Sequence, residues 1–447
     1  MVFRRKIYDK FIDWKNQSNG SSALLVEGAR RVGKSTVVEE FAKREYASYI
    51  IVDFNRPKEG VVDAIVHHPD DLDGLFNLLM VSYGKVLKPR KSLIVFDEVQ
   101  RCPEARQLIK YLVADGRYDY IETGSLISIK KNVKDITIPS EEESIGMFPM
   151  DFEEFCWALG DAVSVDFARK AFNAMQPMGM SAHKAVMKRF REYLIVGGMP
   201  QAVDVYRKTG DFSKVDRTKR TILKLYGDDI SKYAGADAPK VRGIYSQLPG
   251  QLSKKEKKYF LSTVSADARM REYAESFRWL DESRIVSIAR NATDPDIALA
   301  MSEDFGTQKL YSSDTGLLLT QTFANRPYTE NELYRALMLD KLSVNEGMVA
   351  ENAVAQAFRA NGIELYFYSR PDKGDGAGRM EIDFLVRKGD AICPVEVKSG
   401  AYQHHASLDK FRRKFENRLG DAYILYTKDV MIKNDIRHIP LYMAMFL

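Results

Sequence analysis

Residues 28–36, GARRVGKST, decide the fold of the N-terminal part of the chain. The apolar run 23–26 precedes this loop, and Val37, Val38 and Phe41 follow it at helical spacing. A strand, a glycine loop and a helix in this order are the context of a Walker A phosphate-binding loop. A glycine turn that only caps a helix is the alternative, but the fixed glycine, lysine and serine positions together arise rarely by chance.

Each part of this loop has an expected role in binding ATP. The two glycines let backbone N–H groups face the phosphates, and the helix that follows adds the positive end of its dipole. The lysine is expected to reach the β- and γ-phosphates, and the serine hydroxyl to bind Mg²⁺. The expected nucleotide-binding residues are Gly28, Ala29, Arg30, Arg31, Val32, Gly33, Lys34, Ser35 and Thr36, with Ser35 also a metal ligand.

A second apolar run, 93–96, ends in Asp97 and Glu98. A buried parallel strand delivers acids to the C-terminal edge of a sheet in this way. Asp97 is expected to hold Mg²⁺ through water, and Glu98 to orient or deprotonate the attacking water. A third strand ends in Thr123 and Ser125, where a hydroxyl either senses the γ-phosphate or only caps a helix.

Composition excludes several classes of protein. The chain has 447 residues with 45% apolar content, enough for two or three cores. Because it has no apolar run of about 18 residues and its first residues carry charge, we expect a cytoplasmic protein without a membrane partner. Three cysteines without metal spacing argue against a disulfide framework or a zinc site, and a net charge of +5 permits nucleic-acid binding without demanding it.

Strand and helix patterns alternate over about the first 150 residues, as they do in a doubly wound parallel sheet. The chain also resembles, over nearly its full length, the AAA+-type ATPases of bacteria and archaea that end in a domain of unknown function with a PD-(D/E)xK nuclease-like core. The motifs that carry the resemblance are, in order, GARRVGKST, LIVFDEVQ, ETGS, FPMDFEEF, YLIVGGMP, LYGDDISKY, FRWLDESRIV, KLYSSDTGLL, EGMVAENAVAQAF, MEIDFLV and PVEVKSG.

The resemblance implies an α/β fold in four parts. These are a P-loop ATPase domain over 1–150, a helical lid over 151–200, a winged-helix-like domain over 201–325 and a nuclease-like domain over 326–447. It implies ATP and Mg²⁺ as cofactors, and it makes DNA a candidate partner of the winged helix and the C-terminal domain. A basic cluster in the winged-helix region either binds phosphates or is a solvated helix surface, and it comprises Lys254, Lys255, Lys257, Lys258, Arg269 and Arg271.

One departure from the family pattern leaves the oligomeric state open. AAA+-type ATPases usually supply an arginine finger to a neighbouring subunit shortly after the sensor strand, yet no Arg lies between Tyr118 and Ala168. A lysine there would lack the guanidinium fork. Arg30 of the loop is another candidate, in cis or in a neighbouring subunit, and a solvated side chain is its alternative.

The resemblance also implies a second metal site, in the C-terminal domain. Asp383, Glu396 and Lys398 fit the PD-(D/E)xK pattern, with Glu351 on the preceding helix as a fourth member. The three carboxylates are expected to bind Mg²⁺, and Lys398 to activate water or stabilise the transition state. Three interpretations stay open: cleavage of DNA, a nuclease fold kept as a binding module, and charge pairing. The chain is thus either an ATPase that also acts on DNA or an ATP-gated switch that binds without cutting.

Overall fold

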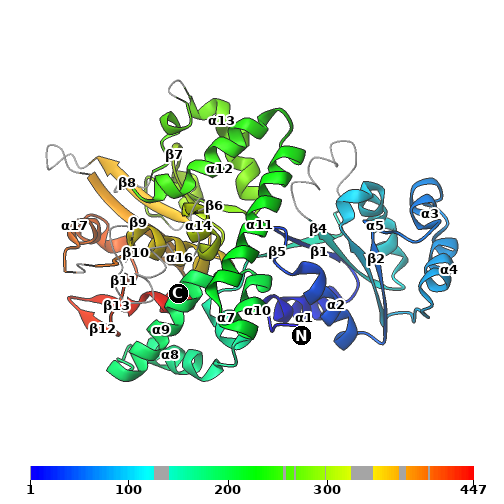
Figure 1. Ribbon diagram of the computed structural model, residues 1–447, viewed down its shortest axis with the longest axis horizontal. Helices are drawn as coiled ribbons and strands as arrows, with labels where there is room; N and C mark the ends of the chain where they lie inside the picture. Colours follow the sequence, from blue (N-terminus) through cyan, green and yellow to red (C-terminus); the bar gives the residue numbers. More distant parts are fainter. Residues whose placement is uncertain are drawn as a thin grey trace. The chain divides into compact units, whose positions relative to one another are not determined.

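The computed structural model describes residues 2–124, 140–254, 258–265, 268–296, 298–323, 346–371, 379–400 and 403–447. The chain divides into two compact units, Met1–Phe148 and Pro149–Leu447. Each unit has its own β-sheet (Figure 1). In these described ranges, no helix is both long enough and apolar enough to cross a membrane.

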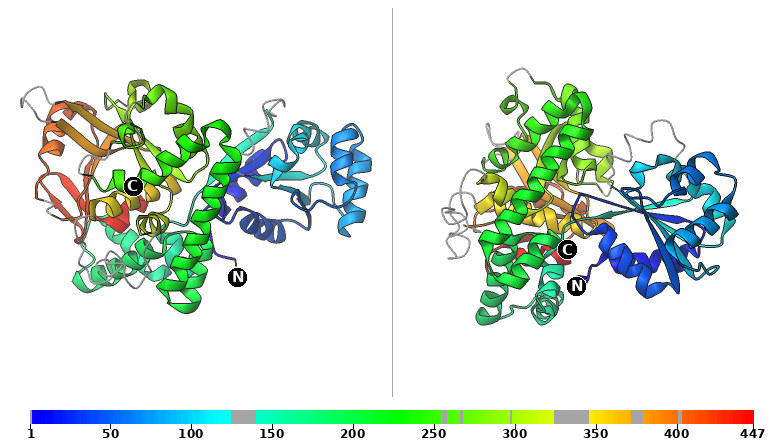
Figure 2. Two further views of the ribbon diagram at one scale, coloured as in Figure 1. Left: turned by 45° about the horizontal axis from the view of Figure 1, so that its top comes forward. Right: turned by 45° about the vertical axis from the view of Figure 1, so that its right-hand side comes forward.

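The first unit is a five-stranded parallel sheet with helices on both faces (Figure 2). Its strand order is β2-β3-β4-β1-β5, and every neighbouring pair is parallel. The strands are β1 (Ala23–Gly28), β2 (Ser48–Asp53), β3 (Ser92–Asp97), β4 (Asp119–Gly124) and β5 (Glu142–Met147). The helices are α1 (Ile7–Ser18), α2 (Lys34–Glu45), α3 (Val61–His67), α4 (Leu72–Tyr83), α5 (Pro103–Asp115) and the short 3₁₀ turn η1 (Val99–Arg101).

This sheet confirms the predicted P-loop architecture of the N-terminal region. Strands β1 and β3 are nearly continuous apolar runs because both of their faces are covered. Leu25 and Phe96 belong to the core under α3, α4 and α5, and α2 packs on the sheet with Val38 and Phe41 buried. Because β4 lies between β1 and β3, the carboxyl ends of these three strands meet at one edge of the sheet.

The second unit combines a helical region with an eight-stranded mixed sheet of order β12-β13-β11-β10-β9-β8-β6-β7. The strands are β6 (Val286–Ala292), β7 (Glu303–Ser312), β8 (Tyr366–Pro371), β9 (Arg379–Lys388), β10 (Ala391–Val397), β11 (Ala422–Tyr426), β12 (Met431–Lys433) and β13 (Ile436–Pro440). The helices are α7 (Phe152–Ala158), α8 (Ala162–Ala174), α9 (Met180–Val196), α10 (Pro200–Thr209), α11 (Phe212–Tyr233), α12 (Ala238–Leu252), α13 (Met270–Glu282), α14 (Thr315–Thr322), α16 (Glu346–Ala360) and α17 (Ala406–Lys414). Short 3₁₀ turns are η2 (Gly235–Asp237), η3 (Leu261–Thr263), η4 (Leu299–Ser302), η6 (Glu416–Arg418) and η7 (Leu441–Phe446).

The hairpin of β6 and β7 lies in the region, 201–325, for which the family resemblance implies a winged-helix-like domain. Its two strands pair with each other, and β6 also pairs in parallel with β8. The hairpin therefore belongs to the sheet of the C-terminal region, and the predicted boundary at 325 falls inside one compact unit. Sequence periodicity could not reveal this, because it predicts strands but not the strands with which they pair.

Several of the motifs that carry the family resemblance meet in a buried polar network in the second unit. Asp314 accepts hydrogen bonds from the backbone N–H of Gly198 (2.5 Å) and Leu317 (2.8 Å). Lys219 of α11 donates to the backbone carbonyls of Ile195 (2.6 Å) and Gly316 (3.1 Å). These motifs therefore supply buried polar contacts within the second unit.

The pKa of Lys219 gives this network a measurable pH dependence. Burial lowers that pKa to about 8, against the attraction of Asp216 and Asp314. Below pH 8 both the folded and the unfolded chain hold the proton, so the cost of burying the charge is fully present. Between about pH 8 and the ordinary lysine value the unfolded chain binds the proton more tightly, so stability rises with pH.

We expect the substitution Lys219→Met to remove this pH dependence. From about pH 7.5 to about pH 9, the free energy of unfolding of the wild type should gain about 1 kcal/mol relative to the variant. Denaturant titrations of both proteins at the two pH values measure the difference, with Lys224→Met, an exposed change on the same helix, as the control. A constant difference would show that Lys219 keeps its proton in the folded protein up to about pH 9, so that burial does not lower its pKa.

Candidate functional site

The glycine loop between β1 and α2 is shaped by two glycines and closed by a lysine. Gly33 has a φ of 100°, in the left-handed region that favours glycine, and it begins α2. A Cβ on Gly28 would lie 2.5 Å from the backbone oxygen of Met147, so only glycine fits there. Lys34 is buried, and its Nζ donates to the carbonyls of Gly28 (2.9 Å) and Ala29 (3.1 Å). The ammonium group therefore lies within the loop, where a positive charge could pair with a bound phosphate.

The acids and hydroxyls predicted around this loop lie together. Ser35 Oγ donates to Asp97 Oδ1 at 2.8 Å, and the hydroxyl of Thr123 donates to the same oxygen. The backbone N–H of Glu98 lies 3.4 Å from Thr123 Oγ1. One carboxylate thus joins the loop helix to the ends of β3 and β4, and a hydroxyl beside an acid is a suitable donor set for Mg²⁺. Ser125 lies outside the described residues.

Glu98 is held in an unusual conformation next to this group. Its φ of 57° and ψ of 46° lie in the left-handed region, directly after the end of β3. Gln100 Nε2 donates to Glu98 Oε2 at 2.6 Å, and Gln100 itself is buried. A non-glycine residue in this region carries strain that is often found at functional sites. Gln100 was not predicted from the sequence, since a glutamine after two acids has no distinctive pattern.

A second residue that the sequence did not point to is Arg5. Its side chain is buried and donates to the backbone oxygens of Val32 (2.9 Å) and Phe148 (2.6 Å). It therefore ties the glycine loop to the segment after β5. Arg30 and Arg31, by contrast, have exposed positions on the loop, and Arg31 has a φ of 68°.

A buried acid lies beside Thr123. Glu122 is inaccessible to solvent, and burial together with the charge of Glu142 raises its pKa well above the ordinary value. Arg106 of α5 forms a two-pronged ion pair with Glu142, at 2.8 and 2.6 Å. Burial beside a second acid thus favours the neutral form of Glu122, on the strand that carries Thr123.

These features define the class of the first unit. Residues 20–156 match the family model described as an AAA domain. Together with the parallel sheet and the glycine loop, this match makes the N-terminal unit an AAA-type P-loop ATPase domain. Residues 187–327 and 346–444 match two further family models, each described as a domain of unknown function (DUF8612 and DUF4143).

Solved structures offer only distant likenesses. The chain is similar to the Walker-type ATPase paby2304 of Pyrococcus abyssi, with 14% identity, a TM-score of 0.42, and coverage of 72% of this chain and 96% of that one. The ORC1 protein of Aeropyrum pernix in complex with DNA gives 12% identity, a TM-score of 0.27, and coverage of 74% and 94%. The RuvB Holliday junction branch migration motor of Thermotoga maritima gives 11% identity and a TM-score of 0.30, with coverage of 64% of this chain and 89% of that one. No curated protein matches the chain, so the class rests on the family match and the loop.

Two of the acids predicted in the C-terminal region meet at a buried lysine. Glu351 of α16 and Asp383 of β9 both lie beside Lys309 of β7, whose Nζ is 3.4 Å from Glu351 and 3.6 Å from Asp383. Glu381 is a third partner at 2.8 Å. Burial alone would lower the pKa of Lys309, but these three carboxylates outweigh it and raise the pKa. We call Lys309, Glu351, Glu381 and Asp383 the lysine cluster.

Glu396 and Lys398 form a separate pair. Their side chains meet at 2.5 Å, and the strand register places Glu396 beside Ile424, a member of the core under α17. Asp383 instead accepts the backbone N–H of Val397 at 2.9 Å. In the parts of the chain that the structure describes, no three acidic, His or Cys side chains are arranged to hold a metal ion. The convergence of Glu351, Asp383, Glu396 and Lys398 on Mg²⁺ stays a prediction: Glu351 and Asp383 meet at the Lys309 ammonium, and Glu396 pairs with Lys398.

The basic cluster predicted in the winged-helix region includes at least one side chain that is buried. Lys255 and Lys257 lie outside the described residues. Lys258 is buried and forms a backbone bridge with Lys309. Lys254 lies over the ring of Phe260, 5.3 Å from its centre. A continuous cationic face of six residues is therefore not available to DNA at this place.

Proposed function

We propose that the chain is an ATP-gated switch: the first unit binds and hydrolyses ATP, and the second unit is a binding module that does not cut nucleic acid. One observation carries the ATPase half. At the carboxyl edge of the parallel sheet, the hydrogen bonds of Ser35 and Thr123 to Asp97 support this half, together with the buried Lys34 inside the glycine loop. An acid in a strained conformation lies beside them.

Each of these side chains has a role when ATP binds. Lys34 would exchange its hydrogen bonds to two loop carbonyls for bonds to the β- and γ-phosphates. Ser35 and Asp97 would hold Mg²⁺, which neutralises charge on those phosphates. Glu98 would position and deprotonate the attacking water, with Gln100 holding its carboxylate. Thr123, hydrogen-bonded to Asp97, would report the presence of the γ-phosphate.

The binding half of the proposal is supported by the lysine cluster. A divalent ion shared by Glu351 and Asp383 would lie where the Lys309 ammonium already lies. Two positive charges at that place would repel each other, so metal-dependent cleavage by these residues is not expected. Nucleic acid is the partner that we propose for this unit.

Removing the loop lysine tests the ATPase half. We expect Lys34→Ala to weaken ATP binding by at least about 100-fold, since the phosphates would enter a buried loop that has lost its cation. Calorimetric titration with ATP and Mg²⁺ measures the affinity. Lys43→Ala, on the exposed face of the same helix where Lys43 pairs with Glu39, is the matched control. Equal ATP affinity in wild type and Lys34→Ala, with unchanged melting temperatures, would contradict the proposal that the glycine loop binds ATP.

A cleavage assay tests the binding half. Purified protein is incubated with Mg²⁺ or Mn²⁺ and linear, nicked and branched DNA, and we expect the substrates to stay intact. Cutting by the wild type that disappears in Asp383→Ala would contradict the proposal and restore the nuclease interpretation. Cutting that survives Asp383→Ala belongs to a contaminant or to another site.

A further inference from the structure

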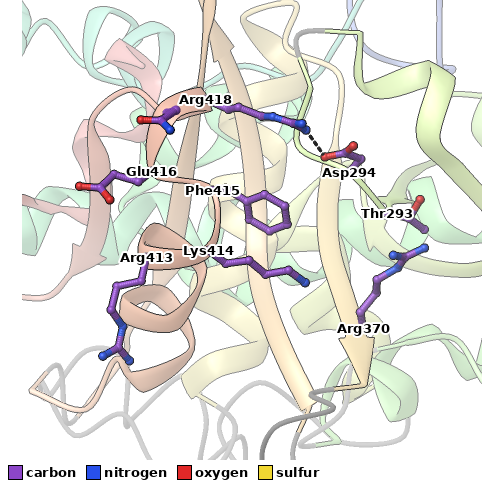
Figure 3. Close-up of a pocket in the computed structure, with 9 residues that line it drawn as sticks. Thr293, Asp294, Arg370, Arg413, Lys414, Phe415, Glu416 and Arg418 are labelled. Carbon is purple, nitrogen blue, oxygen red and sulfur yellow. Dashed lines mark hydrogen bonds and ion pairs between the residues drawn. The ribbon is translucent and has the colours of Figure 1, made fainter.

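A pocket of about 620 Å³ opens in the second unit where η6 follows α17. Its volume is within the range of about 300–1,000 Å³ that is typical of ligand sites. The cations Arg370, Lys414 and Arg418 line it, together with Phe415 and the acid Asp294. Figure 3 shows the ring of Phe415 between the side chains of Arg418 and Lys414, with Arg370 across from them. We call it the Phe415 pocket.

The ring of Phe415 packs against two other aromatic rings. Phe415 meets Phe411 at 4.9 Å between ring centres and Tyr368 at 5.7 Å, nearly perpendicular. Lys414 Nζ lies 5.1 Å from the centre of the Phe415 ring and 3.3 Å from the hydroxyl of Tyr368. Phe415 itself is only half-buried. A rigid aromatic face beside cations is the arrangement on which an unpaired base stacks while its phosphates bind the rim.

The charges extend beyond this pocket. Arg418 is paired with Asp294 at 2.8 Å, and the other lining cations are Arg370, Arg413 and Lys414. Arg370 is also near enough to Asp304 to help lower the pKa of that carboxyl. A neighbouring pocket of about 630 Å³ shares Arg413 and Glu416 with the first and adds Arg412 and Asp409. Asp409 is engaged by His405 at 2.9 Å. A ligand with several phosphates in a row could therefore follow the C-terminal end of α17 from one pocket to the next.

We propose that the Phe415 pocket binds single-stranded nucleic acid, with one base on Phe415 and the flanking phosphates on Arg370 and Lys414. Duplex DNA is disfavoured because its bases are already stacked and paired and cannot enter a pocket. An acidic peptide would use the cations but would gain little from an aromatic face. The proposal rests on the proposed function only in that the second unit is a binding module, and it does not depend on ATP hydrolysis.

Fluorescence anisotropy of the full chain tests this with a labelled oligothymidylate, in EDTA and without ATP. We expect Phe415→Leu, which keeps an apolar floor, to weaken binding about tenfold. Arg370→Gln should lower the slope of log affinity against log salt by about 0.7. Arg387→Gln, an exposed change on the hairpin of β9 and β10, is the control and should do neither.

Competitors separate the alternatives. Unlabelled oligothymidylate or oligouridylate should displace the probe, and which of them is stronger distinguishes DNA from RNA. Displacement by duplex DNA or by polyglutamate at equal charge would overturn the proposal, as would an unchanged affinity in Phe415→Leu with an unchanged melting temperature. Because ATP is absent, loss of turnover in Lys34→Ala has no effect on this result, so the two proposals fail separately.

Discussion

Glu98→Gln is expected to lower ATP turnover by about 10²- to 10⁴-fold while leaving ATP affinity nearly unchanged. The substitution keeps the size of the side chain and its place beside Gln100, but an amide cannot accept the proton of the attacking water. In the proposed site the phosphates would be bound by the glycine loop and Lys34, which this change does not touch. Steady-state phosphate release and ATP titration, measured on the same preparation, separate the two effects.

The matched control for this variant is Glu104→Gln. Glu104 is exposed in the first turn of α5, a few residues further along the chain, and the chemical change is identical. Its turnover should equal that of the wild type. If Glu98→Gln kept its turnover, the base would have to be another group, and the strained backbone at Glu98 would need a different explanation.

Lys309→Met should destabilise the second unit by about 3–5 kcal/mol. The change leaves the side-chain volume nearly the same but removes the cation between Glu351, Glu381 and Asp383. Glu351 also accepts a hydrogen bond from the buried hydroxyl of Tyr311, so it cannot turn to solvent. Denaturant unfolding, followed by a signal from the second unit, measures the loss.

Two further variants show whether the loss comes from unpaired charge. Adding Glu351→Gln to Lys309→Met should recover part of the stability, since one of the buried carboxylates is then neutral. Lys433→Met, on the exposed strand β12, should have little effect. A loss below about 1 kcal/mol in Lys309→Met would mean that the three acids are solvated. Stabilisation by Mn²⁺ of the Lys34→Ala variant with Lys309 intact would mean that the three acids bind a metal.

The nucleotide-binding region could be predicted because its signals are local. The loop residues are consecutive, and the acids follow an apolar strand directly, so the sequence itself places them at strand ends. The order of the strands then brings Asp97 and Thr123 to Ser35. Arg5 could not be predicted, because its contact with Val32 joins residues far apart in sequence and a lysine- or arginine-rich N-terminus is usually solvated.

The lysine cluster marks the limit of such prediction. Lys309 lies far before Glu351 in the sequence, in the segment predicted to be a winged helix. A lysine in a strand is normally exposed, and only its spacing of two from Tyr311, which shares its partner Glu351, hinted at a common face. Asp383 also lies at an irregularity in the pairing of β8 and β9, which redirects side chains in a way that a period of two cannot predict.

The pairing of β6 with β8 has a practical consequence for dissecting the protein. A fragment that begins at α16 would lose the hairpin and expose a row of unpaired backbone groups along β8. Such an open edge invites pairing with other chains and aggregation. The same cut would discard Lys309 and leave its three acids unneutralised. An isolated C-terminal fragment that precipitates would therefore report on the place of the cut, and separation between Phe148 and Pro149 is the division that keeps both sheets whole.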